Sequence, residues 1–220
     1  MDRTPTGARG KTAGSRAILA PVGIALPWMA SVVAGLLAQA VAPTGTTFTL
    51  RVSVVADGEG KAIARPEWLA AELDAAQALF APFGVRFAKT DGALLDARLA
   101  HVETRADRDA FGARVAPHVV DVFVVDSLRD VDDASQMRRG VHWHAPSGAH
   151  YLLLVATAPT SVLAHELGHY FGNPHSHVAD NVMSYERTGA PVFFDAEQGR
   201  RIAAKARAYV QSGELLPVRP

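Results

Sequence analysis

Residues 165–175, HELGHYFGNPH, gather three of the chain's nine histidines with a glutamate and two glycines. His165 and His169 are four residues apart, so on a helix their imidazoles project from one face and can bind the same ion. Gly172 tolerates the positive φ that ends a helix, which lets the following residues return His175 toward that ion. The spacing therefore predicts a metal site with three neutral imidazole ligands and one open position.

Glu166 follows the first of these histidines and is not needed as a ligand. From this position a carboxylate can accept the proton of a water molecule that the metal activates, and can pass it to a leaving amine. Zn²⁺ is the expected cofactor, although three imidazoles also suit several other first-row ions. The predicted chemistry is hydrolysis without a covalent intermediate.

The amino-acid composition excludes several other kinds of site and partner. The 220 residues include no cysteine, which excludes disulfides, thiolate metal ligands and a cysteine nucleophile. Basic and acidic residues balance at 22 each, so the chain lacks the positive field of a nucleic-acid-binding protein. We expect a peptide or protein substrate and no nucleic-acid partner; the oligomeric state cannot be predicted.

The first 42 residues have the pattern of an export segment. Residues 1–16 are basic and residues 17–42 carry no charge. Ala38 and Ala40 form the small-x-small pattern of a signal-peptidase site, which predicts cleavage after Ala40. The uncharged run is also long enough to cross a bilayer, so an uncleaved anchor is the alternative. In either case residues 43–220 are expected outside the cytoplasm, secreted or periplasmic, and membrane-bound only through such an anchor.

Residues 43–220 alternate between strand-like and helix-like patterns, which predicts a single layered α/β or α+β domain. Expected strands cover residues 47–58, 85–89, 119–125, 140–144 and 150–157. Expected helices cover residues 66–84, 106–115, 162–171 and 195–211. Thr160 or Ser161 is expected to cap the helix that carries the first two histidines.

HELGHYFGNPH matches the pattern HExxHxxGxxH of the metzincin metalloproteases at every fixed position, and NVMSYE at 181–186 resembles their Met-turn. The resemblance implies a twisted mixed sheet with about three main helices, and a catalytic domain over residues 43–220. It also implies zinc-dependent endopeptidase activity. In that case the ligands would be His165, His169 and His175, with Glu166 as the general base and Met183 as an apolar floor beneath the metal.

Tyr185 resembles the tyrosine of the astacin and serralysin branches, which can hydrogen-bond the oxyanion during turnover. Ser176, directly after the third histidine, resembles instead the matrixins, which lack that tyrosine. No branch of the family is therefore assigned.

The resemblance also implies an edge strand that pairs with an extended substrate through main-chain hydrogen bonds. The candidate strand consists of Gly140, Val141, His142, Trp143 and His144. Its two histidines, together with His150, either hold a second metal or simply line the cleft.

The segment that follows His175 contains three polar residues, each with two possible interpretations. Asp180 either orients a ligand imidazole as a hydrogen-bond acceptor or is a solvated loop residue. Glu186 and Arg187 either line the pocket beyond the scissile bond or form a solvated pair in a turn.

Two other functions stay open. One is a zinc amidase or a processing enzyme dedicated to one partner protein or to cell-wall peptide. The other is a catalytically silent, zinc-stabilised domain that binds a partner through its edge strand. Glu166 counts against the silent domain, because a binding module gains nothing from a base beside the metal.

Overall fold

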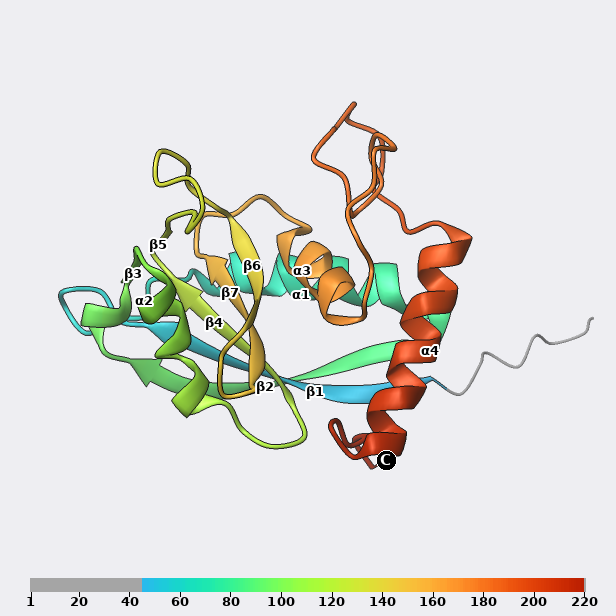
Figure 1. Cartoon of the computed structure of the whole chain (residues 1–220), viewed down its shortest axis with the longest axis horizontal. Helices are drawn as coiled ribbons and strands as arrows, with labels where there is room; N and C mark the ends of the chain where they lie inside the picture. Colours follow the sequence, from blue (N-terminus) through green and yellow to red (C-terminus); the bar gives the residue numbers. More distant parts are fainter. Residues whose placement is uncertain (1–44, 220) are drawn as a thin grey trace, which may run out of the picture. The chain divides into compact units, whose positions relative to one another are not determined.

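The computed structural model describes residues 45–219, so the predicted export segment lies outside the described part of the chain. Its main feature is a five-stranded sheet in the order β2-β1-β4-β7-β6 (Figure 1). Neighbouring strands run parallel except β6, which pairs antiparallel with β7 at one edge. The strands are β1 (Thr46–Val55), β2 (Val85–Leu95), β4 (Val120–Val125), β6 (Gly140–His144) and β7 (His150–Val155). Within residues 45–219 no helix combines the length and hydropathy needed to span a membrane.

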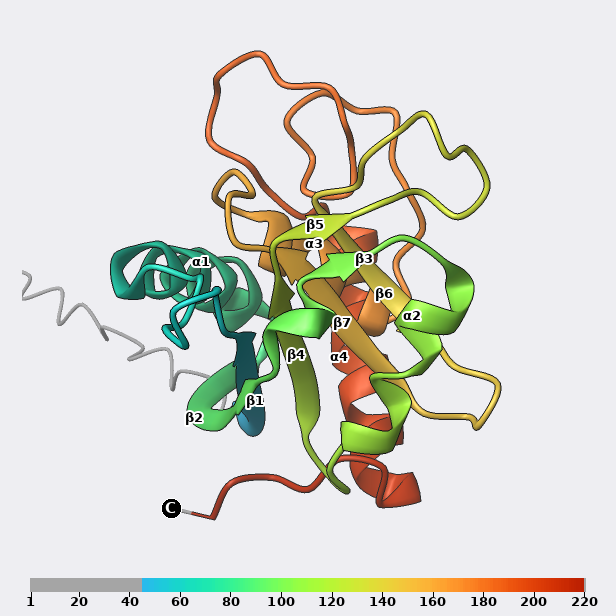
Figure 2. The ribbon, with the colours of Figure 1, turned by 90° about the vertical axis from the view of Figure 1, so that its left-hand side faces the viewer.

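Both faces of this sheet are covered, as Figure 2 shows from the side. The helices α1 (Pro66–Phe80), α3 (Val162–Tyr170) and α4 (Ala196–Ser212) pack on one face. The short helix α2 (Arg105–Asp109) and the paired strands β3 (His101–Val102) and β5 (Ser127–Leu128) lie on the other. The predicted fold class, a layered α/β domain with a mixed sheet and three main helices, is confirmed.

Alternation along the central strand β4 explains this two-layer burial. Val120, Val122 and Val124 belong to the core beneath the three long helices, whereas Phe123 and Val125 belong to the core on the α2 side. Every residue of β4 is buried, and its one charged member, Asp121, pairs with Arg51 of β1.

Most element bounds agree with the sequence prediction, but β2 continues to Leu95 instead of ending at Lys89. Its second half, residues 90–95, is TDGALL, in which polar Thr90 and Asp91 precede two leucines and only Leu95 is buried. This half pairs with β1 at the outer edge of the sheet, where one side of a strand can be solvated. The polar residues Thr90 and Asp91 therefore interrupt the apolar pattern before the strand ends.

Helix α3 is capped from a distant part of the chain. Ser161 occupies the N-cap position with φ +88°, but its side chain makes no capping hydrogen bond. The carboxylate of Glu72, buried on α1, instead accepts a hydrogen bond of 2.9 Å from the N–H of Leu163. The prediction that Thr160 or Ser161 provides the cap is therefore wrong, because α1 packs directly over this end of α3.

Candidate metal centre

Helix α3 carries His165 and His169 on one face. The chain reverses direction just after the helix ends, which brings His175 back toward them. Gly172 has φ +85°, and its N–H donates to the carbonyl of His169 at 2.9 Å. The N–H of Asn173 donates to the carbonyl of Gly168, also at 2.9 Å. These two bonds form a Schellman motif, which reverses the chain so that His175 faces the helix.

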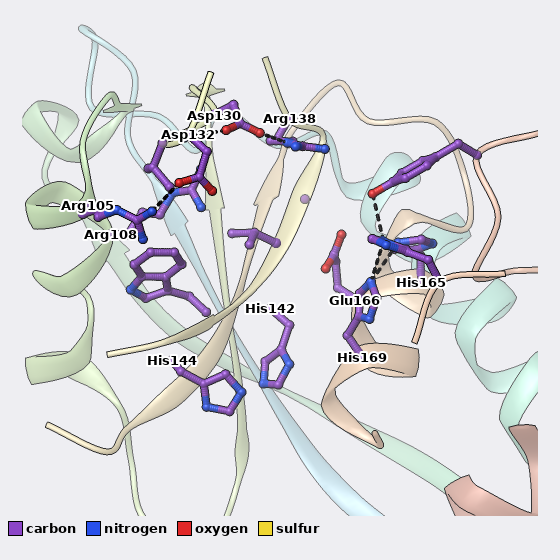
Figure 3. Close-up of a pocket in the computed structure, with 16 residues that line it drawn as sticks. Arg105, Arg108, Asp130, Asp132, Arg138, His142, His144, His165, Glu166 and His169 are labelled. Carbon is purple, nitrogen blue, oxygen red and sulfur yellow. Dashed lines mark hydrogen bonds and ion pairs between the residues drawn. The ribbon is translucent and has the colours of Figure 1, made fainter. Parts of the chain in front are cut away.

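The Nε2 atoms of the three histidines converge on one point beside α3 (Figure 3). Nε2 of His169 lies 3.2 Å from that of His165 and 3.1 Å from that of His175. Tetrahedral zinc with ligand bonds of about 2.0–2.1 Å needs nitrogens about 3.3–3.4 Å apart. The spacing of the three nitrogens therefore suits one small divalent ion.

The protons of the first two imidazoles are placed by backbone carbonyls. Nδ1 of His165 lies 2.7 Å from the oxygen of Val182, and Nδ1 of His169 lies 2.9 Å from the oxygen of Asn173. Because a carbonyl only accepts hydrogen bonds, both Nδ1 atoms carry a proton and both Nε2 atoms present lone pairs. Two facing lone pairs repel each other unless a cation lies between them, so these residues fit a metal ion.

Asp180 does not orient either of these two rings. Its carboxylate accepts hydrogen bonds from the backbone N–H of Thr188, at 2.8 Å, and from the Thr188 hydroxyl. The prediction of a bond from Asp180 to a ligand imidazole is therefore wrong for His165 and His169. Backbone carbonyls already occupy that role, and Asp180 instead stabilises the loop after the third histidine.

Glu166 projects from α3 into the space between that helix and β6 (Figure 3). Burial raises the pKa of its carboxyl group to about 8, although the nearby backbone N–H of His142 acts in the opposite direction. A Cβ on Gly140 would lie 2.9 Å from Oε1 of Glu166, so the glycine leaves the space that this carboxylate occupies. The result is a buried proton acceptor held between the helix and the edge strand.

Met183 is fully buried against the opposite side of α3. A Cβ on Gly168 would lie only 2.3 Å from Sδ of Met183, so the thioether packs directly on the helix between the two histidines. Sequence reasoning did not single out Gly168, although its place between the ligands is the signal that could have found it.

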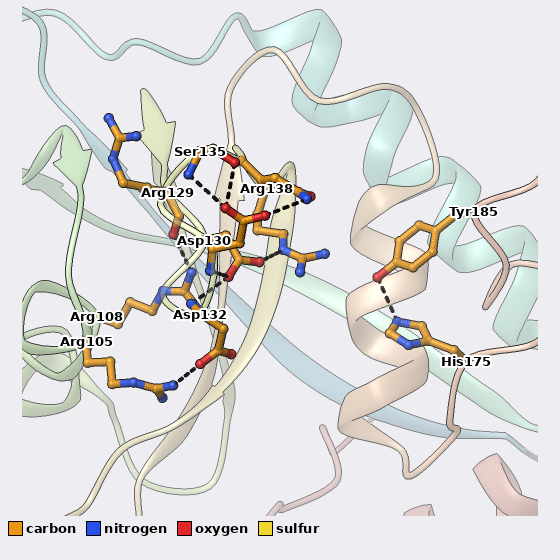
Figure 4. Close-up of polar contacts among 11 residues, drawn as sticks. Arg105, Arg108, Arg129, Asp130, Asp132, Ser135, Arg138, His175 and Tyr185 are labelled. Atoms are coloured by element: carbon orange, nitrogen blue, oxygen red, sulfur yellow. Dashed lines mark hydrogen bonds and ion pairs between the residues drawn. The ribbon is translucent and has the colours of Figure 1, made fainter.

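Tyr185 lies across the metal centre from β6, on the loop that follows the third histidine. Its hydroxyl is 2.9 Å from Nε2 of His175, and its ring points at that imidazole (Figure 4). The side chain is 69% exposed, so its hydroxyl is accessible from the cleft.

A cleft of about 450 Å³ runs between the metal centre and β6. All five residues of β6 line it, and β6 is the outer strand of the sheet, at the predicted bounds. His142 and His144 share one face of β6 and, with His150 of β7, form a second group of three imidazoles.

The far end of the cleft is charged, which sequence reasoning missed. Arg138 pairs with Asp130 and Arg105 pairs with Asp132 (Figure 4). The Arg108 guanidinium lies 4.8 Å from the ring centre of Trp143. These contacts join α2 and β6 to the loop between β5 and β6, so no local pattern in the sequence indicated them.

A second cavity, of about 550 Å³, adjoins Glu166 on its other side. Its lining includes Met137, Arg139, Val162 and Arg187. Nη1 of Arg187 also donates to the carbonyl of Ser184 at 2.6 Å, so this arginine both lines the cavity and braces the loop.

Comparison with known proteins bears on the fold. No family model and no curated protein matches the sequence. Metalloproteinase-II from Bacteroides fragilis is similar in structure, with TM-score 0.52 and 14% identity over 74% of this chain and 54% of that one. Archaemetzincin from Methanopyrus kandleri has TM-score 0.51 and 15% identity over 75% of this chain and 98% of that one. This chain thus matches about half the length of the first protein, and the fold is metzincin-like.

Proposed function

We propose that this protein is a zinc-dependent endopeptidase of metzincin type. The observation that carries the proposal is the convergence of three imidazole Nε2 atoms beside the buried carboxylate of Glu166. The similarity of fold to two metalloproteinases supports it.

In this proposal His165, His169 and His175 hold the zinc ion. When bound, zinc supplies Lewis-acid chemistry that polarises a substrate carbonyl and activates water. Glu166 accepts a proton from the attacking water and delivers it to the leaving nitrogen, so the amine departs neutral. Glu166 and the three histidines line the same cleft.

Two further groups orient the reaction. The backbone of β6 aligns an extended peptide through main-chain hydrogen bonds, as an added strand at the sheet edge. The hydroxyl of Tyr185, beside His175, donates a hydrogen bond to the oxyanion that develops on the substrate carbonyl.

The decisive experiment replaces the base while it keeps the ligands. Glu166→Gln should retain zinc and lower kcat for peptide cleavage by about 10²- to 10⁴-fold, the contribution of a general base. Glu67→Gln, on the exposed side of α1, is the matched control and should behave as the wild type. Unchanged cleavage by Glu166→Gln would disprove the mechanism, and a wild type that binds zinc but cleaves nothing would indicate the silent binding domain.

Substrate class is resolved by a peptide library assayed with and without a chelator. Cleavage within extended peptides, lost on chelation, is the expected result. Activity confined to amides, to cell-wall peptide or to one partner protein would indicate the narrower hydrolases instead.

We also propose an extracytoplasmic location, on the basis of residues 1–42 alone. N-terminal sequencing of exported protein should find a start just after Ala40. An intact leader in the membrane fraction would indicate an anchor, and full-length protein in the cytoplasm would disprove export.

A further inference from the structure

We propose that His142, His144 and His150 form a second metal site, distinct from the helix-borne centre, for a divalent first-row transition ion such as Zn²⁺. The proposal does not depend on the enzymatic activity argued above. It concerns the hairpin of β6 and β7, which forms one wall of the cleft.

The hairpin geometry brings the three rings together. His142 and His144 are two residues apart on a strand, so both side chains leave the same face. His150 is the direct cross-strand partner of His144 on β7, which places their Cβ atoms about 4.5–5.5 Å apart. Each of the three can offer one nitrogen within 4.8 Å of the other two.

Glu214, in the segment after α4, sets the orientation of His150. Its Oε1 lies 2.6 Å from Nε2 of His150, so this nitrogen carries the proton and Nδ1 presents its lone pair. Nδ1 in turn faces Nε2 of His142 at 2.9 Å. A carboxylate that holds the remote nitrogen of an imidazole is a frequent support for a metal-ligating histidine.

Aromatic packing fixes the same ring from its side. His150 stacks on Tyr170 of α3, with ring centres 4.3 Å apart and planes 11° from parallel. His144 is the exposed member of the group, with a nitrogen within 4.8 Å of the other two, and its side chain is free of hydrogen bonds within residues 45–219. Binding would require this side chain to move until the nitrogens are about 3.3 Å apart.

Occupation of this site would stiffen the edge strand. The ion would join β6 to β7, and through Glu214 to the segment after α4. Gly140 of the same strand lies so close to Glu166 that a Cβ there would come within 2.9 Å of Oε1, so the position of this strand and that of the carboxylate are linked. The alternative is a metal-free chain of hydrogen bonds from His142 through His150 to Glu214, in which His144 has no part.

Metal stoichiometry tests the proposal. The full-length protein, dialysed with Zn²⁺ and then against metal-free buffer, should retain two equivalents by mass spectrometry of its metal content. His144→Ala and His150→Ala should each retain one, and His177→Ala, an exposed histidine near the third helix-site ligand, should retain two. A wild type with one equivalent, or a folded His144→Ala with two, would overturn the second site.

The His169→Ala background separates this site from the proposed active centre. In that background one equivalent should remain, and Glu214→Gln should weaken its binding to Zn²⁺ about 10- to 100-fold in competition with a chromophoric chelator. No binding at all in a folded His169→Ala protein would overturn the inference. Loss of the hairpin equivalent in His144→Ala without any peptidase activity in the wild type would sink the enzyme proposal and leave this site standing.

Discussion

The protein has two groups of three histidines, the helix group (His165, His169 and His175) and the hairpin group (His142, His144 and His150). They have the same composition but are built from different secondary structure. The helix group comes from one turn of α3 and the reversal after it, and backbone carbonyls place its protons. The hairpin group comes from two antiparallel strands, and a carboxylate and a stacked tyrosine orient its central ring.

This difference fits the two roles proposed above, a catalytic centre at the helix group and a structural metal site at the hairpin group. Beside the helix group lie a buried carboxylate and an exposed phenol, which can transfer a proton and stabilise an anion. Beside the hairpin group lie the ring of Tyr170 and the carboxylate of Glu214, which is already hydrogen-bonded to His150, and both can hold the strand in place.

The largest expected effect comes from removing one ligand from each group. His169→Ala should abolish peptide cleavage, because the metal is lost from the proposed active centre. His144→Ala should lower kcat/KM by about tenfold or less, or roughly 1.4 kcal/mol, because it loosens only the substrate strand. Steady-state kinetics on one fluorogenic peptide measure both. Equal losses would erase the functional distinction between the groups.

Tyr185→Phe tests the chemistry assigned to the helix group. We expect kcat to fall by about 10²- to 10³-fold with zinc content unchanged, the usual effect of losing one oxyanion donor. KM should change little, because the hydrogen bond forms mainly in the transition state. A rise in KM at constant kcat would instead assign Tyr185 to substrate binding.

Glu72, which caps the start of α3, should make the free energy of unfolding depend on pH. Burial raises its pKa to about 7 from an ordinary 4.5, so the folded protein holds this proton more tightly than the unfolded chain. Its contribution to the free energy of unfolding is therefore complete below pH 4.5 and is lost as the pH rises through about 7. The shift corresponds to about 3 kcal/mol.

Glu72→Gln should remove this pH dependence, because the amide does not titrate, while it keeps an oxygen that can accept the hydrogen bond from the N–H of Leu163. Urea unfolding of wild type and variant, at pH 5 and pH 8 with equal zinc, measures how strongly the free energy of unfolding of each protein depends on pH. Histidine ligands titrate in both proteins and cancel in the comparison. Parallel pH profiles would show that Glu72 is not the responsible group.

The smallest expected effect concerns the packing of Met183 against Gly168 of α3. Gly168→Ala places a methyl group against Sδ of Met183, and overpacking of this kind costs about 1–3 kcal/mol. Thermal unfolding measures the loss, and in the double variant with Met183→Ala the total loss should be smaller than the sum of the two single losses. Additive losses in the double variant would show that the two residues do not compete for space.

The candidate ligands could be proposed from sequence because their geometry is local. Helical spacing sets His165 beside His169, and Gly172 ends the helix wherever this turn folds. Strand alternation likewise placed β6 at its observed bounds. The predicted role of Asp180 failed for two rings, since a nearby carboxylate in the chain need not be near in space.

What the sequence by itself determined was a set of neighbouring residues whose side chains share a face: two histidines and a glutamate on a helix, two histidines on a strand. Tertiary structure alone decided what these groups meet. Glu72 reaches Leu163 across 91 residues, and Glu214 reaches His150 across 64. Backbone dihedrals fix relations within a turn or a strand, whereas contacts at such separations exist only after the core has packed α1 and α4 against the sheet.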